Sequence, residues 1–237
     1  MYVADTVALY DDIYTRIKNY EDEARKIREW ILRFSPGAKS ILDVACGTAE
    51  HAKYLKKDFS LDGLDDNEEF LSVARKKNPE CRYFQADMRD FHLEKKYDVV
   101  MSLFSSIGYV KTQESLEKTL RCFADHLTPS GIIVVEPWLT PDAWNPGKRP
   151  FMLTIDEPTF KVCRMNVTET RNGLSYFKWH FLVGKPDEVK HFTEEHTLGL
   201  FSVEQMKNAF QNAGLSVQHD EKGIFERGLY IAKKVGR

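Results

Sequence analysis

Carboxylates that could bind a nucleoside stand near the ends of expected strands. The segment Ser40–Glu50 begins as an apolar run, breaks at Cys46-Gly47-Thr48 and continues with helical spacing. Such a strand, turn and helix hold nucleotide-like ligands at the carboxyl end of the strand. Asp65 ends the next expected strand, where a carboxylate can accept hydrogen bonds from both hydroxyls of a ribose. Asp87-Met88 ends the third, where Asp87 could accept from an adenine amino group while Met88 packs on the ring.

Each of these carboxylates also has a purely structural interpretation. Asp65 could form a turn or cap the following helix, although Asp66 competes for the cap. Asp87 could cap a turn that begins before Arg89. Asp43, inside the first expected strand, is a candidate buried acid, and we expect backbone N–H groups of the following turn to satisfy its charge.

The turn argues against a dinucleotide. The dinucleotide fingerprint G-x-G-x-x-G requires three glycines, and the corresponding positions here are Ala45, Gly47 and Glu50. A carboxylate at Glu50 would compete with a pyrophosphate for the helix N-terminus. The turn therefore favours a ligand that places no phosphate on the helix.

Composition narrows the class of protein and its partners. The chain has 237 residues, 42% of them hydrophobic, which is enough for the core of a large α/β domain. The 34 Lys and Arg residues nearly balance the 36 Asp and Glu residues, so no basic field favours nucleic acid. No apolar run reaches the roughly 18 residues that predict a membrane span.

The cysteines and histidines indicate a cytoplasmic protein without a metal. The cysteines form no C-x-x-C pair, and we expect them to be reduced thiols, as is usual in the cytoplasm. His191 and His196 fall on opposite faces of an expected strand, which does not favour a metal site.

The first part of the chain alternates between expected strands and helices. Strands are expected at 40–44, 59–64, 81–85, 97–103 and 132–135, helices at 5–14, 20–34, 49–55, 68–77 and 115–127, and a turn at 128–131. This alternation predicts an α/β fold, with a parallel sheet, right-handed crossovers and helices on both faces.

The pattern changes after Trp138. A loop rich in proline and tryptophan is followed by expected short strands at 161–164, 174–183 and 191–200, with a hairpin signal at Asn172-Gly173. This predicts an antiparallel β insertion. Ser202-Val203-Glu204-Gln205 is a capping box that begins a helix reaching Ala213, and strands at 215–219 and 229–232 return to the sheet.

We therefore expect one domain over residues 1–237 with three parts. They are a cofactor-binding core at about 38–137 and 201–234, an antiparallel insertion at about 138–200, and an N-terminal helical cap at 1–36. The exposed edges of an antiparallel insertion need cover, which predicts a homodimer formed through the insertion.

The strand-end motifs resemble a known family. Asp43-Val44-Ala45-Cys46-Gly47-Thr48, Asp65 and Asp87-Met88 resemble the Rossmann-like class I S-adenosylmethionine-dependent methyltransferases over residues 38–137. Ala45 and Ala49 stand where many members have glycine, and we expect the loop to be kept. The resemblance implies a mostly parallel seven-stranded sheet and S-adenosylmethionine as cofactor. The implied cofactor-binding residues are Asp43, Ala45, Cys46, Gly47, Thr48, Asp65, Asp87, Met88, Ser105 and Tyr10.

Longer motifs resemble the N,N-dimethyltransferases of deoxyaminosugar biosynthesis, as in desosamine and mycaminose formation. The matching segments are Asp87–Phe91, Met101–Tyr109, Val134–Trp138 and Arg227-Gly228-Leu229, with Tyr2 and Tyr10 near the N-terminus. These enzymes methylate the amino group of a nucleotide-linked sugar. The chain departs from them at Gly223–Glu226, which replaces a small, Gly/Ser-rich approach, and is only loosely similar over Leu139–Lys161.

The resemblance implies roles in an in-line methyl transfer to an amine. The protein would mainly align and desolvate the reactants and accept the proton of the amine. Tyr109 would face the amine, Glu136 could orient it or bind a water, and Tyr2 could close over the cofactor or substrate. Trp138 could pack on a sugar face, and Arg227 could pair with a nucleotide phosphate.

Alternatives stay open at these positions. Tyr109 and Trp138 also suit core positions, Arg227 suits the surface, Tyr2 suits a disordered end, and Ser105 could simply turn the chain. The acceptor could be another amine or a hydroxyl of a small molecule, or the fold could bind S-adenosylmethionine without catalysis.

Overall fold

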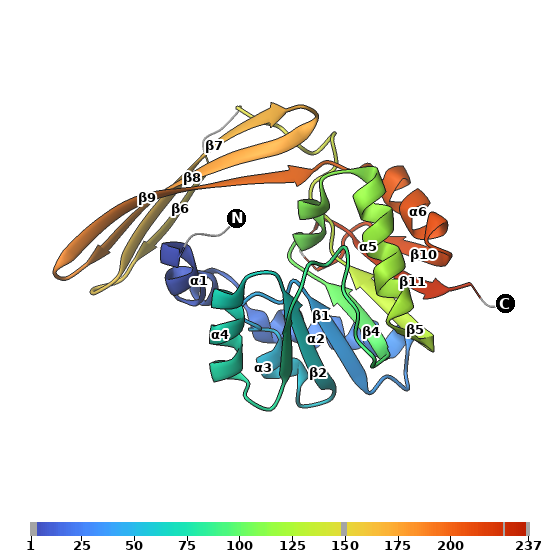
Figure 1. Ribbon diagram of the computed structural model, residues 1–237. Helices are drawn as coiled ribbons and strands as arrows, with labels where there is room; N and C mark the ends of the chain where they lie inside the picture. The colour runs from blue at the N-terminus through green and yellow to red at the C-terminus, as the bar shows by residue number, and fades with distance from the viewer. Residues whose placement is uncertain (1–3, 148–150, 225, 236–237) are drawn as a thin grey trace.

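A seven-stranded sheet forms the centre of the molecule (Figure 1). The computed structural model describes residues 4–147, 151–224 and 226–235. The strands are β1 (Ser40–Val44), β2 (Ser60–Asp65), β3 (Arg82–Gln85), β4 (Tyr97–Ser102), β5 (Leu127–Val135), β10 (Leu215–Asp220) and β11 (Leu229–Lys234). Their order is β10-β11-β5-β4-β1-β2-β3. The pairs β10–β11 and β11–β5 are antiparallel and the other neighbouring pairs are parallel, so β11 runs opposite to the other six strands. The expected mostly parallel sheet is confirmed.

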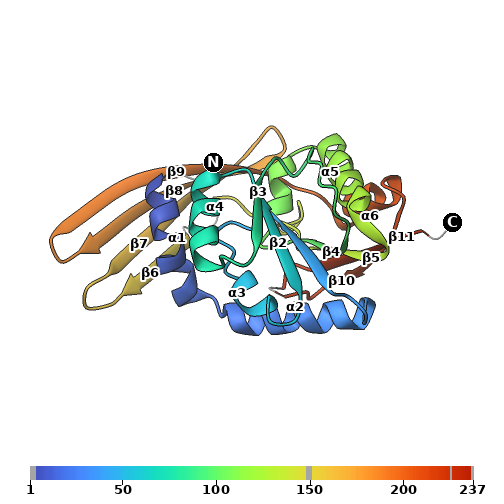
Figure 2. The ribbon, with the colours of Figure 1, turned by 60° about the horizontal axis from the view of Figure 1, so that its bottom comes forward.

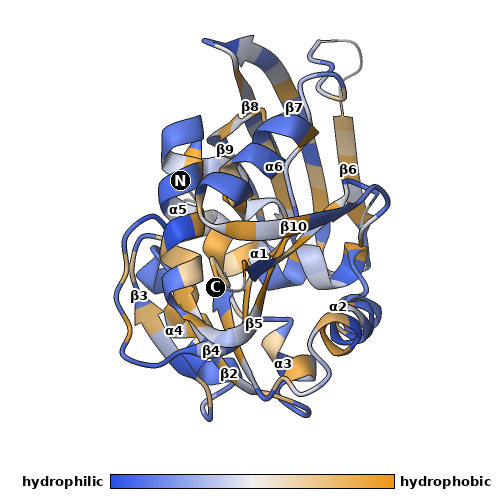
Figure 3. Ribbon diagram, turned by 90° about the vertical axis from the view of Figure 1, so that its right-hand side faces the viewer, coloured by the Kyte–Doolittle hydropathy of each residue, from blue (hydrophilic) through white to orange (hydrophobic). Residues whose placement is uncertain are grey.

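Helices cover both faces of this sheet. The helices α2 (Tyr20–Phe34), α3 (Ala52–Leu55) and α4 (Glu68–Lys77) contribute buried residues to one face, and α5 (Gln113–Asp125) and α6 (Val203–Asn212) to the other. Because side chains alternate along a strand, Ile41 of β1 packs on the α2 side and Leu42 on the α5 side. Hydrophobic segments gather in the interior, while the outer surface of α2 is hydrophilic (Figure 3).

Two details of the core differ from expectation. The helix expected at 49–55 is confined to Ala52–Leu55, because the chain is still turning before it. The turn expected at 128–131 is wrong, since these residues lie within β5. The chain returns to the sheet as soon as α5 ends, where the Tyr97 N–H donates to the His126 carbonyl at 2.8 Å. The register then shifts before Ile132 pairs with Val99, so the proline and glycine fall in an irregular stretch of strand.

The insertion is a four-stranded antiparallel sheet in the order β6-β7-β8-β9. Its strands are β6 (Phe151–Asp156), β7 (Lys161–Arg171), β8 (Leu174–Lys185) and β9 (Glu188–Gly199). No strand was expected at β6, and the other three strands are longer than expected. The hairpin between β7 and β8 is confirmed, with φ angles of 52° at Asn172 and 75° at Gly173.

The first helix lies between the insertion and the core (Figures 1 and 2). This helix, α1 (Ala4–Ile17), buries Leu9, Ile13 and Tyr14 in a cluster with Ile155 and Phe181 of the insertion. The insertion and α1 therefore form a roof over the carboxyl ends of the central strands, where ligands bind in open α/β sheets.

Candidate active site

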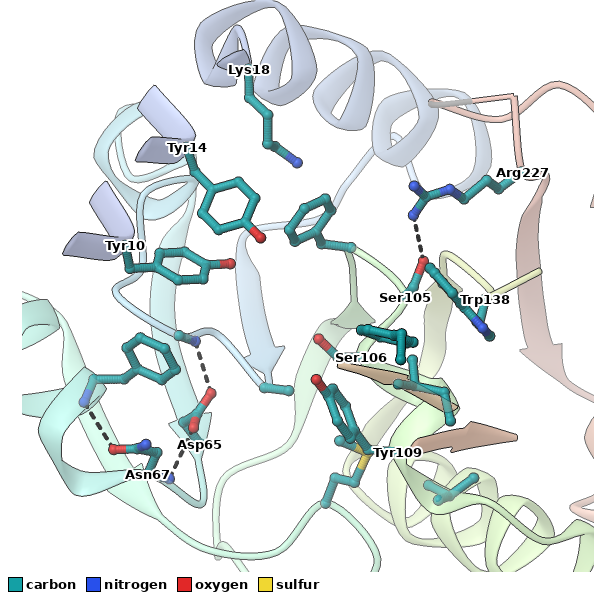
Figure 4. Close-up of a pocket in the computed structure, with 18 of the residues that line it drawn as sticks. Tyr10, Tyr14, Lys18, Asp65, Asn67, Ser105, Ser106, Tyr109, Trp138 and Arg227 are labelled. Carbon is teal, nitrogen blue, oxygen red and sulfur yellow. Dashed lines mark hydrogen bonds between the residues drawn. The ribbon is translucent and has the colours of Figure 1, made fainter. Parts of the chain in front are cut away.

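A cavity of about 950 Å³ lies between the sheet and this roof (Figure 4). The turn after β1, the end of β2 and α1 line one side, and η1 (Ser106–Val110), Trp138, Arg227 and the insertion line the other. Its volume is at the upper end of the range typical for small-molecule sites. The sequence-derived candidates on its wall are Tyr10, Ala45, Gly47, Asp65, Asp87, Met88, Ser105, Tyr109, Trp138 and Arg227.

The turn after β1 keeps the expected loop although alanines replace glycines. Ala45, Gly47 and Ala49 have φ angles of 60°, 56° and 55°, a region that costs a non-glycine residue about 1–2 kcal/mol. A Cβ built at Gly47 would meet nothing within 4 Å, so the backbone is open to the cavity at this point. The turn can therefore receive a ligand closely against its backbone.

Asp65 is a buried carboxylate on the cavity wall. Its Oδ2 accepts from the Gly47 N–H at 2.8 Å, and its Oδ1 accepts from the Asn67 N–H at 2.9 Å. Burial raises the pKa of Asp65 to about 6. The α4 cap is Asn67, whose side chain accepts from Glu69 N–H and Phe70 N–H. Neither Asp65 nor Asp66 caps the helix, but Asp65 does form the turn that the structural alternative included, by accepting from the Asn67 N–H.

Asp43 lies behind the turn and does not line the cavity in the described part of the chain. It is 3% exposed, and burial together with the charge of Asp65 raises its pKa to about 8. The carboxyl is therefore neutral at pH 7. The expectation that turn N–H groups satisfy a charged Asp43 is wrong, because the Gly47 N–H donates to Asp65 instead.

Cys46 and Thr48 also face away from the cavity lining that the structure describes. The Cys46 Sγ would lie 2.8 Å from a Cβ at position 63, which places it against Gly63 of β2. Burial raises the pKa of its thiol, and all four cysteines are free. The Thr48 hydroxyl donates to Asp11 Oδ1 at 2.6 Å. Cys46 therefore fixes the turn to β2, and Thr48 fixes it to α1. The structure does not support direct contact of their side chains with the cofactor.

Asp87 and Met88 reach the cavity after β3. Asp87 also accepts from the Arg89 N–H at 2.8 Å and the Arg89 Nε at 2.9 Å. These bonds lower the pKa of Asp87 and keep it charged. Asp87 therefore caps the turn before Arg89, as the structural alternative predicted, and also lines the cavity.

The first helix contributes a cluster that sequence analysis identified only at Tyr10. The Tyr10 and Tyr14 rings lie 4.4 Å apart, and Tyr14 meets Phe104 at 5.4 Å. The Lys18 Nζ lies 3.6 Å from the Phe104 ring centroid and 3.3 Å from Glu23 Oε2. Burial lowers the pKa of Lys18, while Glu23 opposes the shift. Tyr2 lies outside the described residues.

Glu136 lies beneath the cavity wall. It is fully buried, does not line the cavity in the described residues, and accepts from the Phe104 N–H through Oε2 at 2.7 Å. Burial raises its pKa to about 7, and the positive charges of Lys18 and Arg227 oppose this shift. The position of Glu136 does not support the expected direct contact with an amine. Glu136 instead holds the backbone at Phe104.

Ser105, Arg227 and Trp138 form one side of the cavity (Figure 4). The Ser105 hydroxyl donates to the Pro137 carbonyl at 2.8 Å and accepts from Arg227 Nη1 at 2.9 Å. The Arg227 guanidinium lies 5.3 Å from the Trp138 ring centroid. The Trp138 indole donates to Ser175 at 2.9 Å. These contacts hold the guanidinium on the wall, so it is not a solvated surface group.

Tyr109 projects its hydroxyl into the site from η1 (Figure 4). The hydroxyl lies 2.7 Å from His196 Nδ1, and His196 Nε2 lies 2.5 Å from Glu194 Oε1. No functional role was expected for His196 or Glu194. The chain gives no local signal for this contact, because a strand of the insertion carries both residues far from η1.

Other kinds of site are absent from the described ranges. Residues 4–147, 151–224 and 226–235 contain no group of three His, Cys, Asp or Glu side chains placed to hold a metal ion. No helix within those ranges is long and apolar enough to cross a membrane.

The fold and this wall define a class I S-adenosylmethionine-dependent methyltransferase. The open backbone at Gly47 and the carboxylate at the end of β2 suit the cofactor. Residues 41–131 match the family model described as a methyltransferase domain.

Comparison of the whole chain narrows the class. It is 38% identical over 235 residues to the dTDP-3-amino-3,4,6-trideoxy-alpha-D-glucopyranose N,N-dimethyltransferase of Streptomyces venezuelae, covering 98% of both chains. It is 36% identical over 232 residues to the dTDP-3-amino-3,6-dideoxy-alpha-D-glucopyranose N,N-dimethyltransferase of Streptomyces fradiae, covering 97% of this chain and 91% of that one.

Solved structures agree. The crystal structure of Streptomyces venezuelae DesVI has a TM-score of 0.93 at 37% identity and covers 99% of this chain and 100% of its own. The SAM-bound structure of CalS10, an amino pentose methyltransferase from Micromonospora echinaspora, has a TM-score of 0.88 at 28% identity. It covers 99% of this chain and 98% of its own. The chain therefore belongs to the sugar N,N-dimethyltransferases that use S-adenosylmethionine.

Proposed function

We propose that the protein transfers methyl groups to the amine of a dTDP-linked deoxyaminosugar, giving the N,N-dimethyl product. The observation that carries this proposal is the division of one cavity into two walls. The turn after β1 and Asp65 form the cofactor wall, and Trp138, Arg227 and the insertion form a wall of aromatic and cationic groups. Tyr109 of η1 lies on the same side of the cavity as Trp138 and Arg227. The names of the relatives support the same acceptor.

On the cofactor wall, we assign each role by its chemistry. Asp65 is the acceptor for the ribose hydroxyls, and Met88 packs on the adenine ring beside Asp87. Lys18, held among Phe104, Glu23 and the roof, is the cation for the carboxylate of the methionine moiety. Ser105 fixes Arg227 and the loop after β4.

On the acceptor wall, Arg227 is the partner of the nucleotide phosphate. A guanidinium has several N–H donors in a planar fork that matches phosphate oxygens, and the Ser105 oxygen accepts one of them. Trp138, Trp144 and Phe177 line the same wall and offer flat apolar faces to a sugar or a base. This combination fits a sugar nucleotide better than a small free amine.

The residues of the chain supply alignment and a dry environment for the reaction. S-adenosylmethionine supplies the electrophilic methyl group when bound. The aromatic wall excludes water from the reacting centre, and holding both reactants in one cavity removes much of the entropic barrier. Tyr109 is the polar group that meets the sugar amine.

The test uses the purified protein with S-adenosylmethionine and matched acceptors. dTDP-linked 3-amino and 4-amino deoxysugars are compared with the same aminosugars lacking the nucleotide, by release of S-adenosylhomocysteine and product mass. The expected result is release with a dTDP-linked sugar and a product carrying two added methyl groups. Turnover confined to small free amines would contradict the proposal.

We further propose that two copies associate through the outer face of the insertion. This face exposes Met152, Met165, Val167, Leu182 and Val189, each between 48% and 70% exposed. Met152 pairs directly with Met165, so the patch is continuous across β6 and β7. Apolar patches of this kind commonly mark protein interaction sites.

The free thiols support a cytoplasmic location.

A further inference from the structure

Tyr109, His196 and Glu194 form a hydrogen-bonded chain that runs from the cavity into the insertion sheet. The Tyr109 hydroxyl is 2.7 Å from His196 Nδ1, and His196 Nε2 is 2.5 Å from Glu194 Oε1. The side chains of His196 and Glu194 are both 0% exposed. A buried polar chain of this kind is stabilising only when each member donates and accepts in a consistent direction.

The chemistry of the three groups sets that direction. A carboxylate can only accept, so the proton on His196 lies on Nε2 and is donated to Glu194. Burial lowers the pKa of His196 and keeps the ring neutral. Nδ1 then holds a lone pair, and the Tyr109 hydroxyl must donate to it. The phenol oxygen is consequently an acceptor toward the cavity.

The surroundings of His196 hold this arrangement in place. Its ring stacks on Phe177 at 5.2 Å and lies 4.3 Å from Trp179, both from β8. Among the described residues, the charged or titratable groups near it include Glu194 of β9, Tyr109 of η1 and Arg164 of β7, whose positive charge disfavours a second proton on the ring. From α1, Tyr14 contacts Arg164 at 3.2 Å. The ring is therefore held in one orientation and is neutral in the resting site, with Glu194 placed to stabilise an imidazolium when one forms.

We propose that Glu194 and His196 are positioning residues that hold the Tyr109 oxygen as the hydrogen-bond acceptor for the sugar amine. This inference rests on the proposed function. An N–H of the acceptor donates to Tyr109, which fixes the nitrogen against the wall. A site that presents an acceptor selects a group that carries hydrogen, as an ammonium or an amine does.

The same chain provides a route for the proton that the ammonium must lose. The N–H bond of the ammonium breaks as an O–H bond forms on Tyr109. The original hydroxyl proton of Tyr109 passes to His196 Nδ1. The products are a neutral amine with its lone pair available and an imidazolium beside the Glu194 carboxylate. Atoms and charge balance, and no further reactant is needed.

The direct test is nitrogen-15 NMR of histidine-labelled protein without substrate, with the His196 signals assigned by comparison with His196→Gln. The expected wild-type ring has a protonated Nε2 and a bare Nδ1. In Glu194→Gln the amide N–H can donate to Nε2, so the proton is expected to move to Nδ1. A wild-type ring protonated on Nδ1, or on both nitrogens, would overturn the inference whether or not any acceptor turns over.

Kinetics of Glu194→Gln on a dTDP-linked aminosugar provide the second readout. We expect kcat to fall about 10²-fold near neutral pH, the scale of proton-transfer catalysis, with unchanged affinity for S-adenosylmethionine. The loss should shrink as pH rises, because more of the amine is then already neutral. Tyr109→Phe should lose as much, and Glu194→Gln should add nothing to Tyr109→Phe.

The matched control is Glu195→Gln, the next residue on the same strand. Glu195 is exposed and lies 3.1 Å from Lys178 on the opposite face of the sheet. It should behave as wild type in kcat and pH profile. Equal kcat in Glu194→Gln and Glu195→Gln, with wild-type turnover intact, would overturn the inference. Wild-type failure on every dTDP-linked aminosugar would instead count against the proposed function, and the NMR result would still decide the direction of the chain.

Discussion

The backbone N–H of Gly47 donates a 2.8 Å hydrogen bond to Asp65 Oδ2, which joins the turn after β1 to the end of β2. The other carboxylate oxygen accepts from the Asn67 N–H. One side chain therefore fixes two loops and also faces the cavity. The shape of the cofactor wall and its main polar contact depend on the same residue.

Asp65→Ala is expected to weaken S-adenosylmethionine binding by about 1.5–3 kcal/mol, the scale of hydrogen bonds to charged groups. Calorimetry measures the change in Kd. The exposed Glu69→Ala variant on α4 is the control and should bind as wild type. An unchanged Kd in Asp65→Ala would remove this carboxylate from the cofactor site.

Arg227→Lys is expected to raise KM for a nucleotide sugar by roughly tenfold while leaving the Kd for S-adenosylmethionine unchanged. Lysine keeps the charge but loses the planar fork that a phosphate matches. Initial rates on the dTDP-linked sugar and on the same sugar without nucleotide provide the measurement. A similar loss with both acceptors would show that Arg227 serves the structure, through Ser105 and Trp138, and not the phosphate.

Asp43→Asn is expected to gain stability over the wild type as pH rises from about 5 to about 7. The pKa of Asp43 is about 8 in the folded protein against a reference of 3.8. Between these values the folded state keeps a proton that the unfolded state releases. The free energy of unfolding of the wild type therefore falls by about 1.4 kcal/mol for each pH unit through this group.

The Asp43 linkage is measured by urea unfolding of both proteins without cofactor at the two pH values. Asparagine has the same shape and cannot ionise, so it removes only this contribution. The difference between variant and wild type should grow with pH. A difference of equal size at both pH values would mean that Asp43 is not a neutral carboxyl in the folded state.

The double substitution Met165→Lys and Leu182→Lys is expected to separate the proposed dimer into monomers. It places two charges on the apolar outer face of the insertion, where association would have to bury them. Sedimentation at micromolar concentration compares it with Glu114→Lys, an exposed position on α5. A monomeric wild-type protein would contradict the proposal.

Sequence patterns predicted the central fold because its strands are buried on both faces. Ile132–Val135 is fully apolar, and such runs are readable without tertiary information. The expected turn at 128–131 was wrong because Pro129 and Gly131 signal a turn locally, whereas pairing with β4 decides the outcome. The strand β6 was missed because it begins with three consecutive apolar residues at 151–153, and its alternation of apolar and polar residues is confined to the last four positions.

The site was predicted where the motif places a residue at a strand end, as for Asp65 and Gly47. Neighbouring residues of the same motif point to opposite sides, and this explains why Cys46 and Thr48 do not line the cavity in the described residues. Glu136 ends a strand too, but its side chain turns under the loop that carries Phe104. Sequence spacing carries no information on which side a side chain takes at such a bend.

Contacts between distant segments lay beyond sequence reasoning altogether. His196 meets Tyr109 only because β9 crosses above η1, and no local pattern relates the two residues. Lys18 directly follows α1, where a lysine is typical of any solvated helix terminus, although here it packs against Phe104. Only the folded arrangement reveals that Lys18 lines the cavity and that His196 supports Tyr109 on its wall.

The most direct test of the central claim is kcat/KM for one deoxyaminosugar presented with and without its dTDP group. Mass spectrometry of the products follows each added methyl group. We expect the dTDP-linked sugar to be converted through a monomethyl to a dimethyl amine at least about 10²-fold more efficiently, since remote binding energy assists the reaction at the amine. Equal or better conversion of the free aminosugar would contradict the account.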